Sequence, residues 1–337
     1  MGELCSVIGC GSWGTAIATA LARNDHSVKI YSRREKQVKT INSAGENRDY
    51  FPGVKLPKQV TATTDINYCL QNASFIFISV PTSATLDTIQ QISTDLPENG
   101  VVISTAKGLQ VESFKTNYQM ISENTDLPVC VLSGPTHAEE VIKNQPSAAV
   151  VASKSRAAAR NVQDLLRSRR FRIYTNPDVR GVELGGAVKN VIAVAAGASD
   201  GLGYGDNARA ALITRGLAEI GRLGEELGAN FLSFSGLSGL GDLIVTCNST
   251  HSRNRTFGYK IGQGKDRDTA LEEVGQVVEG VRTTRAIYKQ KQMGKISADM
   301  PITEEIYRVL FEDKSPLEAV DNLMTRDPKT ELKKWKQ

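Results

Sequence analysis

The stretch Gly9-Cys10-Gly11-Ser12-Trp13-Gly14 follows the short apolar run Leu4–Ile8 and opens a helical pattern that continues to Arg23. A G-x-G-x-x-G sequence between a strand and a helix is typical of a dinucleotide-binding βαβ unit. The first glycine permits the tight turn, the second lets the backbone approach the pyrophosphate, and the third lets the helix pack on the strand. We therefore predict that Gly9, Gly11 and Gly14 bind a nicotinamide or flavin nucleotide. The alternative is a glycine-rich turn without a ligand.

The end of the second predicted strand, Ser27–Tyr31, bears on which nicotinamide nucleotide binds. An acid at this position would bind the ribose 2′-hydroxyl of NAD. The chain instead has Ser32-Arg33-Arg34, and we expect the nearest acid, Glu35, to lie in the following helix. Arginines suit a 2′-phosphate because their hydrogen bonds to it are charge-assisted. We expect NADP to be accepted or preferred; alternatively, both arginines are solvated and NAD is bound loosely.

The rest of the first half continues the alternation of strands and helices. Further apolar runs predict strands at 75–80, Val101–Ser104, 129–132, 148–152 and 171–174. Alternating strands and helices predict an α/β fold with a doubly wound, mostly parallel sheet of the Rossmann type. Beyond residue 180 the pattern is helical, with helices expected at 181–199, 208–227, 269–275, 280–291 and 300–311. We predict a nucleotide-binding domain at 1–180 and an all-α domain at 181–337.

Composition limits the classes of protein that fit. A chain of 337 residues suits two domains, and the net charge of +4, which comes partly from residues 329–337, favours anionic ligands and not nucleic acid. The five cysteines form no C-x-x-C pair and the three histidines have no metal-ligand spacing, so we expect buried thiols and no metal site. With no signal-peptide pattern and no run of 18 apolar residues, we expect a cytoplasmic protein without a membrane span.

Candidate chemical groups follow three of the predicted strands. Ligands of doubly wound sheets bind at the carboxyl ends of the strands. Here these ends carry Val80-Pro81-Thr82, Thr105-Ala106-Lys107-Gly108 and Ser133-Gly134-Pro135-Thr136-His137. Lys107 is placed where its ammonium could bind a substrate anion or a carbonyl oxygen. The alternative is an ordinary loop lysine.

Lys189 lies in Glu183-Leu184-Gly185-Gly186-Ala187-Val188-Lys189-Asn190-Val191-Ile192, a helix that is almost wholly apolar. Lysine is rarely buried without a partner. Desolvation would lower its pKa toward neutrality, which suits proton transfer in catalysis. The alternative, which composition alone does not exclude, is that the side chain extends to the surface.

Two polar segments of the second half complete the candidate site. The glycine-rich segment Gly236-Leu237-Ser238-Gly239-Leu240-Gly241-Asp242 ends in an acid that could partner Lys189 or cap a helix. Next comes Ser249-Thr250-His251-Ser252-Arg253-Asn254-Arg255, which we interpret as a polar loop. Arginine together with serine and asparagine donors is suited to phosphate binding. The alternative is a solvated basic loop.

Taken together, these motifs resemble the soluble NAD(P)-dependent glycerol-3-phosphate dehydrogenases of bacteria. The segments that carry the resemblance are 9–16, 107–109, 133–140, 183–190, 236–242, 252–255 and 277–280. They occur in the family's order and the likeness extends from about residue 4 to residue 325. Cys10 departs mildly, since a small apolar residue is usual there, but only its backbone faces the phosphate turn.

The resemblance implies reversible reduction of dihydroxyacetone phosphate to sn-glycerol 3-phosphate with NADP(H) or NAD(H), which supplies glycerophospholipid biosynthesis. It implies that Lys189 is the catalytic proton donor or acceptor. Besides the three glycines, the positions it implies for the cofactor are Ser12, Trp13, Arg33, Arg34, Lys107, Ala138, Arg253, Val277 and Glu279. Those it implies for the substrate are Lys107, Gly134, Thr136, Lys189, Asp242, Ser252, Arg253 and Asn254.

We expect these groups to meet in the cleft between a nucleotide-binding domain and a substrate-binding domain. Two other functions remain open at this point. A β-hydroxy acid dehydrogenase would share the architecture and an active-site lysine but bind a carboxylate substrate. A non-catalytic NADP sensor would keep the glycine turn without needing Lys189, Asp242 and Arg253. The apolar helices of the second half also make a homodimer plausible.

Overall fold

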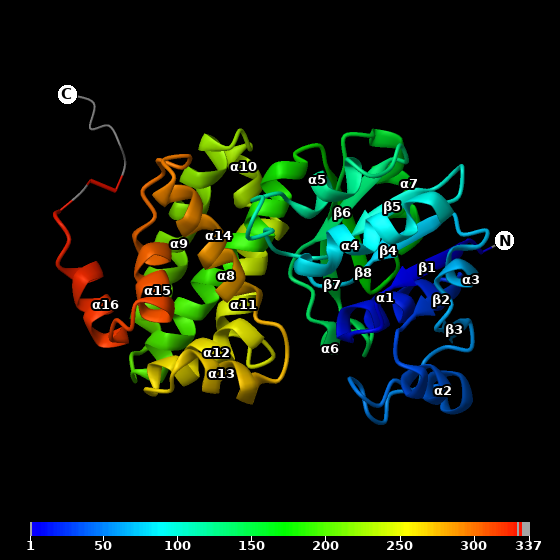
Figure 1. Cartoon of the computed structure of the whole chain (residues 1–337), viewed down its shortest axis with the longest axis horizontal. Coiled ribbons are helices and arrows are strands. Elements are labelled where there is room, and N and C mark those ends of the chain that lie inside the picture. The colour runs from blue at the N-terminus through cyan, green and yellow to red at the C-terminus, as the bar shows by residue number, and fades with distance from the viewer. Residues whose placement is uncertain (1, 329, 332–337) are drawn as a thin grey trace.

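Eight strands form one sheet in the computed structural model, which describes residues 2–328, 330 and 331 (Figure 1). Their order is β3-β2-β1-β4-β5-β6-β7-β8, and every neighbouring pair is parallel except β6 and β7. The order of the first six is that of the doubly wound nucleotide-binding fold. The strands are β1 Leu4–Ile8, β2 Ser27–Tyr31, β3 Val60–Thr63, β4 Phe75–Ile78, β5 Val101–Ser104, β6 Val129–Ser133, β7 Ser147–Ala152 and β8 Phe171–Asn176.

Helices cover both faces of this sheet, and the strand sequences show why. All four residues of β4 are buried. Phe75 and Phe77 belong to one hydrophobic cluster and Ile76 and Ile78 to another, because successive side chains of a strand point to opposite faces. Such continuously apolar strands are typical of a sheet covered on both sides. The covering helices are α1 Ser12–Arg23, α2 Glu35–Ala44, α3 Ile66–Leu70, α4 Thr82–Ile92, α5 Asn117–Ser122, α6 Ala138–Val141 and α7 Arg156–Leu166.

The predicted doubly wound, mostly parallel sheet is confirmed, with one strand added. β3 was not expected, because its four residues include two threonines and stand among polar residues. It pairs with β2 at the edge of the sheet and buries only Val60 and Ala62. The five cysteines are all free and buried, as expected. Lys329 and residues 332–337 of the basic tail lie outside the described residues.

The C-terminal domain is helical and is organised around α8, Val179–Gly201 (Figure 1). Helix α8 is the described helix that is long and apolar enough to cross a membrane by length and composition, and every residue of the tested window is buried inside the protein. The surrounding helices are α9 Asp206–Glu226, α10 Phe231–Phe234, α11 Asp242–Asn248, α12 Arg253–Gly262, α13 Arg267–Val274, α14 Glu279–Gln292, α15 Pro301–Phe311 and α16 Pro316–Met324.

Helices α8 and α12 meet backbone to backbone along a row of glycines. A Cβ atom on Gly197 of α8 would lie 2.0 Å from the carbonyl oxygen of Arg255, and one on Gly258 of α12 would lie 2.0 Å from that of Val194. A Cβ on Gly201 or on Gly262 would lie 2.2 Å from a carbonyl oxygen of the opposite helix. We call Gly197, Gly201, Gly258 and Gly262 the glycine seam. Only glycine permits this approach, so the seam fixes the start of α12 against α8.

Candidate active site

The three glycines of the β1–α1 turn have three different environments. Gly9 has φ +115°, and a Cβ there would lie 2.6 Å from the carbonyl oxygen of Ser79. A Cβ on Gly14 would lie 1.9 Å from the carbonyl oxygen of Gly9, so this glycine permits close packing of α1 on the turn. A Cβ on Gly11 would meet nothing within 4 Å, which leaves room for a pyrophosphate beside the backbone. Gly11 is the N-cap of α1 and provides no side-chain cap, so the helix N-terminus is free to bind an anion.

Lys189 is buried in the middle of α8, so of the two alternatives left by the sequence the buried one is correct. The residue is 5% exposed. Its Nζ donates to Asp242 Oδ1 at 2.7 Å and to Thr246 Oγ1 at 2.6 Å. Burial lowers the pKa of Lys189 to about 8, opposed by the Asp242 carboxylate and reinforced by the positive charge of Lys107. A lysine in this state can both donate and accept a proton near neutral pH.

Asp242 joins two lysines across the junction of the sheet and the helical domain. Its Oδ1 pairs with Lys189 on α8 and its Oδ2 accepts from Lys107 Nζ at 2.8 Å. Burial disfavours the Asp242 carboxylate, but the two ammonium groups outweigh burial and hold its pKa below the usual range. The alternative of a helix cap is wrong, because Asp242 is the first residue inside α11 and Gly241 occupies the N-cap. We call Lys107, Lys189 and Asp242 the lysine–aspartate cluster.

The ends of β5 and β6 bring two further predicted residues to this cluster. Lys107 follows β5, and its Nζ also donates to the carbonyl oxygen of Gly134 at 2.8 Å. Gly134 follows β6 with φ +135°, and Thr136 Oγ1 donates to the same carbonyl at 3.1 Å. The carboxyl ends of two parallel strands thus lie beside the ammonium groups, where ligands of such sheets bind.

The segment 249–255 is only partly a loop, which corrects the interpretation from sequence. Ser252 is the N-cap of α12 and its side chain accepts from the backbone N–H of Arg255, so Arg253 and Asn254 lie in the first helical turn. Arg253 is exposed, and one of its terminal nitrogens donates to Gln276 Oε1 at 3.4 Å. Asn254 donates to Asn190 Oδ1 on α8 at 2.9 Å and accepts from the backbone N–H of Gly280 at 2.8 Å.

Three predicted cofactor positions lie around the start of α6 and α14. Ala138 is the first residue of α6 and is buried. Val277 precedes α14, and Glu279 opens it. Glu279 Oε1 accepts from the backbone N–H of Thr82 at 3.1 Å, which links α14 to the start of α4. Burial raises the pKa of the Glu279 carboxyl.

Several buried polar atoms near these positions lack a partner in the part of the chain that the structure describes. They include Trp13 Nε1, Glu279 Oε2 and His137 Nε2. A buried polar group without a hydrogen bond costs free energy, and each such group in a folded protein calls for an explanation, such as a role in binding or catalysis. These atoms, together with the open space at Gly11, fit a bound dinucleotide and a polar substrate.

Sequence reasoning missed residues that the structure brings to the cluster. Thr246 is one helical turn after Asp242, a spacing that could have revealed it. Asn190, next to Lys189, donates to the carbonyl oxygen of Lys107 at 3.1 Å. His137, which the sequence had already placed among the candidate groups after β6, has its pKa lowered by burial and by the charges of Lys189 and Lys107.

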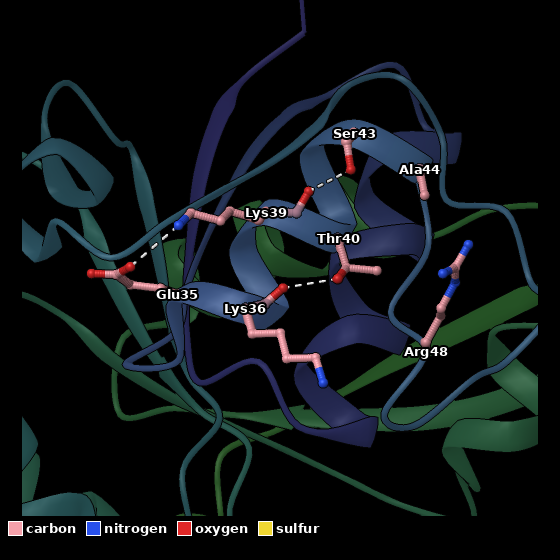
Figure 2. A pocket seen from close by; sticks show the side chains of 7 residues that line it. All are labelled: Glu35, Lys36, Lys39, Thr40, Ser43, Ala44 and Arg48. Atoms are coloured by element: carbon pink, nitrogen blue, oxygen red, sulfur yellow. Dashed lines mark hydrogen bonds and ion pairs between the residues drawn. The ribbon is translucent and has the colours of Figure 1, made fainter.

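Arg33 and Arg34 lie apart from the cluster, at the end of β2, where a nucleotide's adenosine ribose is expected. Both are exposed. A surface hollow of about 640 Å³ lies nearby against the outer side of α2 (Figure 2). It is lined by Glu35, Lys36, Lys39, Thr40, Ser43, Ala44 and Arg48. None of these residues belongs to the lysine–aspartate cluster.

A glycine turn of the dinucleotide-binding kind, and a buried lysine paired with an aspartate in a helical domain, are together typical of a two-domain nicotinamide-dependent dehydrogenase. Residues 5–159 match the family model described as NAD-dependent glycerol-3-phosphate dehydrogenase N-terminus, and residues 178–321 match the model described as its C-terminus. The chain belongs to the NAD-dependent glycerol-3-phosphate dehydrogenase family.

Individual relatives agree with this assignment over the whole chain. A glycerol-3-phosphate dehydrogenase [NAD(P)+] from Halothermothrix orenii is 53% identical, with 98% of this chain and 97% of the relative covered. One from Geobacillus thermodenitrificans is 49% identical, with 98% of this chain and 97% of the relative covered. The crystal structure of glycerol-3-phosphate dehydrogenase from Coxiella burnetii has a TM-score of 0.92 at 37% identity and covers 96% of this chain and 99% of that one.

Proposed function

We propose that the protein reduces dihydroxyacetone phosphate to sn-glycerol 3-phosphate, reversibly, with NADPH or NADH. The observation that carries the proposal is the lysine–aspartate cluster, which lies between the ends of β5 and β6 and helices α8 and α11, with Lys189 and Asp242 buried. The names of the relatives, glycerol-3-phosphate dehydrogenase [NAD(P)+], support it. The product supplies glycerophospholipid synthesis.

The nucleotide would be held first by the glycine turn, because free N–H groups at the start of α1 bind phosphate. When bound, the reduced nicotinamide supplies the hydride. The unpartnered Trp13 Nε1 and Glu279 Oε2 support roles for these side chains in holding it. The further residues assigned to it are Gly9, Gly11, Ser12, Gly14, Arg33, Arg34, Lys107, Ala138, Arg253 and Val277.

The proton comes from Lys189. As the ketone carbon is reduced, negative charge develops on its oxygen, and the Lys189 ammonium donates a proton to that oxygen. Asp242 orients the ammonium and keeps a counter-charge beside it, since it lies 2.7 Å from the Nζ. The ammonium of Lys107, which pairs with the other carboxylate oxygen of Asp242, stabilises the negative charge that develops on the ketone oxygen. In the reverse reaction, neutral Lys189 accepts the proton of the alcohol.

The phosphate of the substrate is assigned to the first turn of α12. Arg253 supplies a planar guanidinium for two parallel hydrogen bonds, and Ser252 and Asn254 supply shorter polar groups. The N-terminus of α12 adds its own partial positive charge. Gly134 and Thr136 complete the substrate set from the end of β6.

The reduction is expected to lose rate as the pH rises above about 8, because burial sets the pKa of Lys189 near that value. Above it the lysine is increasingly neutral and has no proton to donate. For the oxidation of glycerol 3-phosphate, kcat/KM should instead increase as the pH rises through about 8, because the neutral lysine is then the active form. Measurement of kcat/KM in both directions across pH 6 to 10 checks this. If kcat/KM changed with pH in the same direction for both reactions, the role of Lys189 as proton donor and acceptor would be contradicted.

Replacing Arg253 with alanine is expected to raise the KM for dihydroxyacetone phosphate about 10- to 100-fold, as expected for loss of hydrogen bonds to a charged group. With saturating nucleotide, so that any weaker nucleotide binding does not limit the rate, unphosphorylated dihydroxyacetone should be reduced as slowly by the variant as by the unchanged protein. Arg156→Ala is the control, because Arg156 is an exposed arginine at the start of α7. An unchanged KM in the Arg253 variant would remove the phosphate assignment.

The function itself is tested with a panel of substrates, followed by the absorbance of the nucleotide. Dihydroxyacetone phosphate should be reduced with NADPH and with NADH. Turnover of β-hydroxy acids in its place would support the related dehydrogenase class. Nucleotide binding without any turnover would support a sensor.

We also infer the organisation that surrounds this reaction. A nucleotide-binding domain at 1–180 and a substrate-binding domain at 181–337 are supported by the change from alternating strands to helices at α8. A cytoplasmic location is supported by the five free, buried cysteines, which suit a reducing compartment. A homodimer is supported by exposed apolar side chains of the helical domain, such as Leu232 and Ile244.

A further inference from the structure

An acidic side chain does lie beside the end of β2, but it comes from a segment further along the sequence. Arg34 pairs with Asp49, its terminal nitrogen 2.9 Å from Asp49 Oδ2, and the two side chains are 53% and 45% exposed. The guanidinium also lies over the ring of Tyr50, 5.7 Å from its centre. Asp49 and Tyr50 belong to residues 45–59, which we call the α2–β3 loop.

A buried polar network holds the α2–β3 loop against the glycine turn. Asn47 Nδ2 donates to Thr15 Oγ1 on α1 at 2.7 Å, and Asn47 Oδ1 accepts from Gln37 at 3.0 Å. Gln37 also donates to the carbonyl oxygen of Cys10, within the turn, at 2.9 Å. Asp49 follows Asn47 closely in the chain, so this network fixes its position relative to the turn.

The ion pair therefore lies where the nucleotide's adenosine ribose is expected. Burial raises the pKa of the Cys10 thiol to about 12, and within that environment Arg34 lowers the pKa while Asp49 raises it. The charged groups of Arg34 and Asp49 are thus close enough to the glycine turn to act on a side chain within it. An arginine and a carboxylate side by side at this position suit both nucleotides. The carboxylate can bind the ribose 2′-hydroxyl of NAD, and the arginine can bind the 2′-phosphate of NADP.

The neighbouring acids are already engaged elsewhere. The Glu35 carboxylate points to Lys39, 3.5 Å away on the outer side of α2, and its side chain is 76% exposed (Figure 2). Glu46 accepts from the backbone N–H of Gly53 at 2.6 Å, within its own loop. Asp49 is the acid that Arg34 itself holds beside the end of β2.

We propose that Arg34 and Asp49 together determine nucleotide preference: Asp49 accepts from the ribose 2′-hydroxyl of NADH, and Arg34 donates to the 2′-phosphate of NADPH. This rests on the proposed NAD(P)H-dependent reaction. Each group opposes the other's ligand. The Asp49 carboxylate repels a 2′-phosphate and occupies Arg34, whereas Arg34 holds Asp49 away from a hydroxyl. The pair thereby admits both nucleotides and gives neither a large advantage.

Opposite single substitutions test the pair. Asp49→Asn should tighten binding of 2′,5′-ADP and weaken that of 5′-ADP, each by about threefold to fivefold, the range for partly exposed charges. Arg34→Gln should do the reverse. Dissociation constants are measured by calorimetry at low salt, because solvent screens this pair. The ratio of kcat/KM for NADPH and NADH should move in the same two directions.

Asp126→Asn is the matched control, since Asp126 is an exposed acid outside the α2–β3 loop and the substitution changes the net charge equally. It should leave both dissociation constants unchanged. If Asp49→Asn weakens both analogues equally, or shifts their ratio no more than Asp126→Asn, the proposed role of Asp49 is overturned. If the unchanged protein binds neither analogue, the nucleotide-binding function fails as well, which separates the two failures.

Discussion

Replacing Lys189 with alanine is expected to lower kcat for dihydroxyacetone phosphate by about 10²- to 10⁴-fold, the usual contribution of a general acid. Nucleotide binding should survive, because the hydrogen bonds of the Lys189 ammonium go to Asp242 and Thr246 on α11 and not to the glycine turn. Steady-state rates give kcat, and titration with NADPH gives the dissociation constant. The combination distinguishes loss of proton transfer from loss of the folded nucleotide site.

Two further variants make this result specific to the amine. Lys189→Met keeps most of the side-chain volume without a proton and should be as slow as the alanine variant. Lys143→Ala removes an exposed lysine after α6 and should be fully active. A small primary alkylamine in the buffer should restore part of the rate to Lys189→Ala. Near-normal turnover in either Lys189 variant would show that the proton comes from another group.

Asp242→Asn is expected to affect both stability and catalysis. The substitution leaves two ammonium groups with no carboxylate between them, and breaking a buried ion pair costs about 3–5 kcal/mol of unfolding free energy. Without Asp242, which raises it, the pKa of Lys189 should fall below about 8. Less of the lysine is then protonated at neutral pH, so the rate of reduction falls and its alkaline limb moves to lower pH.

The stability difference should itself depend on pH. The folded-state pKa of Asp242 is lowered, so its contribution is present above the ordinary aspartate pKa of about 4 and is lost as the pH falls through the lower, folded-state value. Denaturant unfolding at several pH values measures this. Glu219→Gln is the control, because Glu219 is a buried acid on α9 that binds the backbone of Ile302 and Thr303. It should change stability without moving the alkaline limb of the rate.

Local sequence predicted the parts of the fold and site that depend on neighbouring residues. The glycine turn is one example, because a strand, three glycines and a helix in succession dictate the conformation around Gly9 and Gly14. The long apolar helix around Lys189 is another. Its sequence did not decide whether the lysine was buried, since a long side chain can reach the surface from such a helix. Burial was decided by α11, which brings Asp242 and Thr246 to the ammonium.

Other features depend on segments distant in the chain. The direction of β7 relative to β6 is set by the path of the chain between them, which the apolar pattern of either strand does not report. The acid beside Arg34 is a further case. Glu35 is nearer in sequence, but the hydrogen bonds of Asn47 and Gln37 fold the α2–β3 loop back and bring Asp49 there instead.

The glycine seam between α8 and α12 has a consequence for the size of the substrate. Lys189, the proposed proton donor, lies on α8, whereas Arg253 and Asn254, proposed to bind the phosphate, open α12. Their spacing is set by contact between two backbones, and a close-packed contact of that kind has no side chain that could rotate to relax it. The seam thus holds the proposed proton donor and the proposed phosphate-binding turn at a fixed separation, which limits how many carbon atoms can lie between the reacting carbonyl and the phosphate.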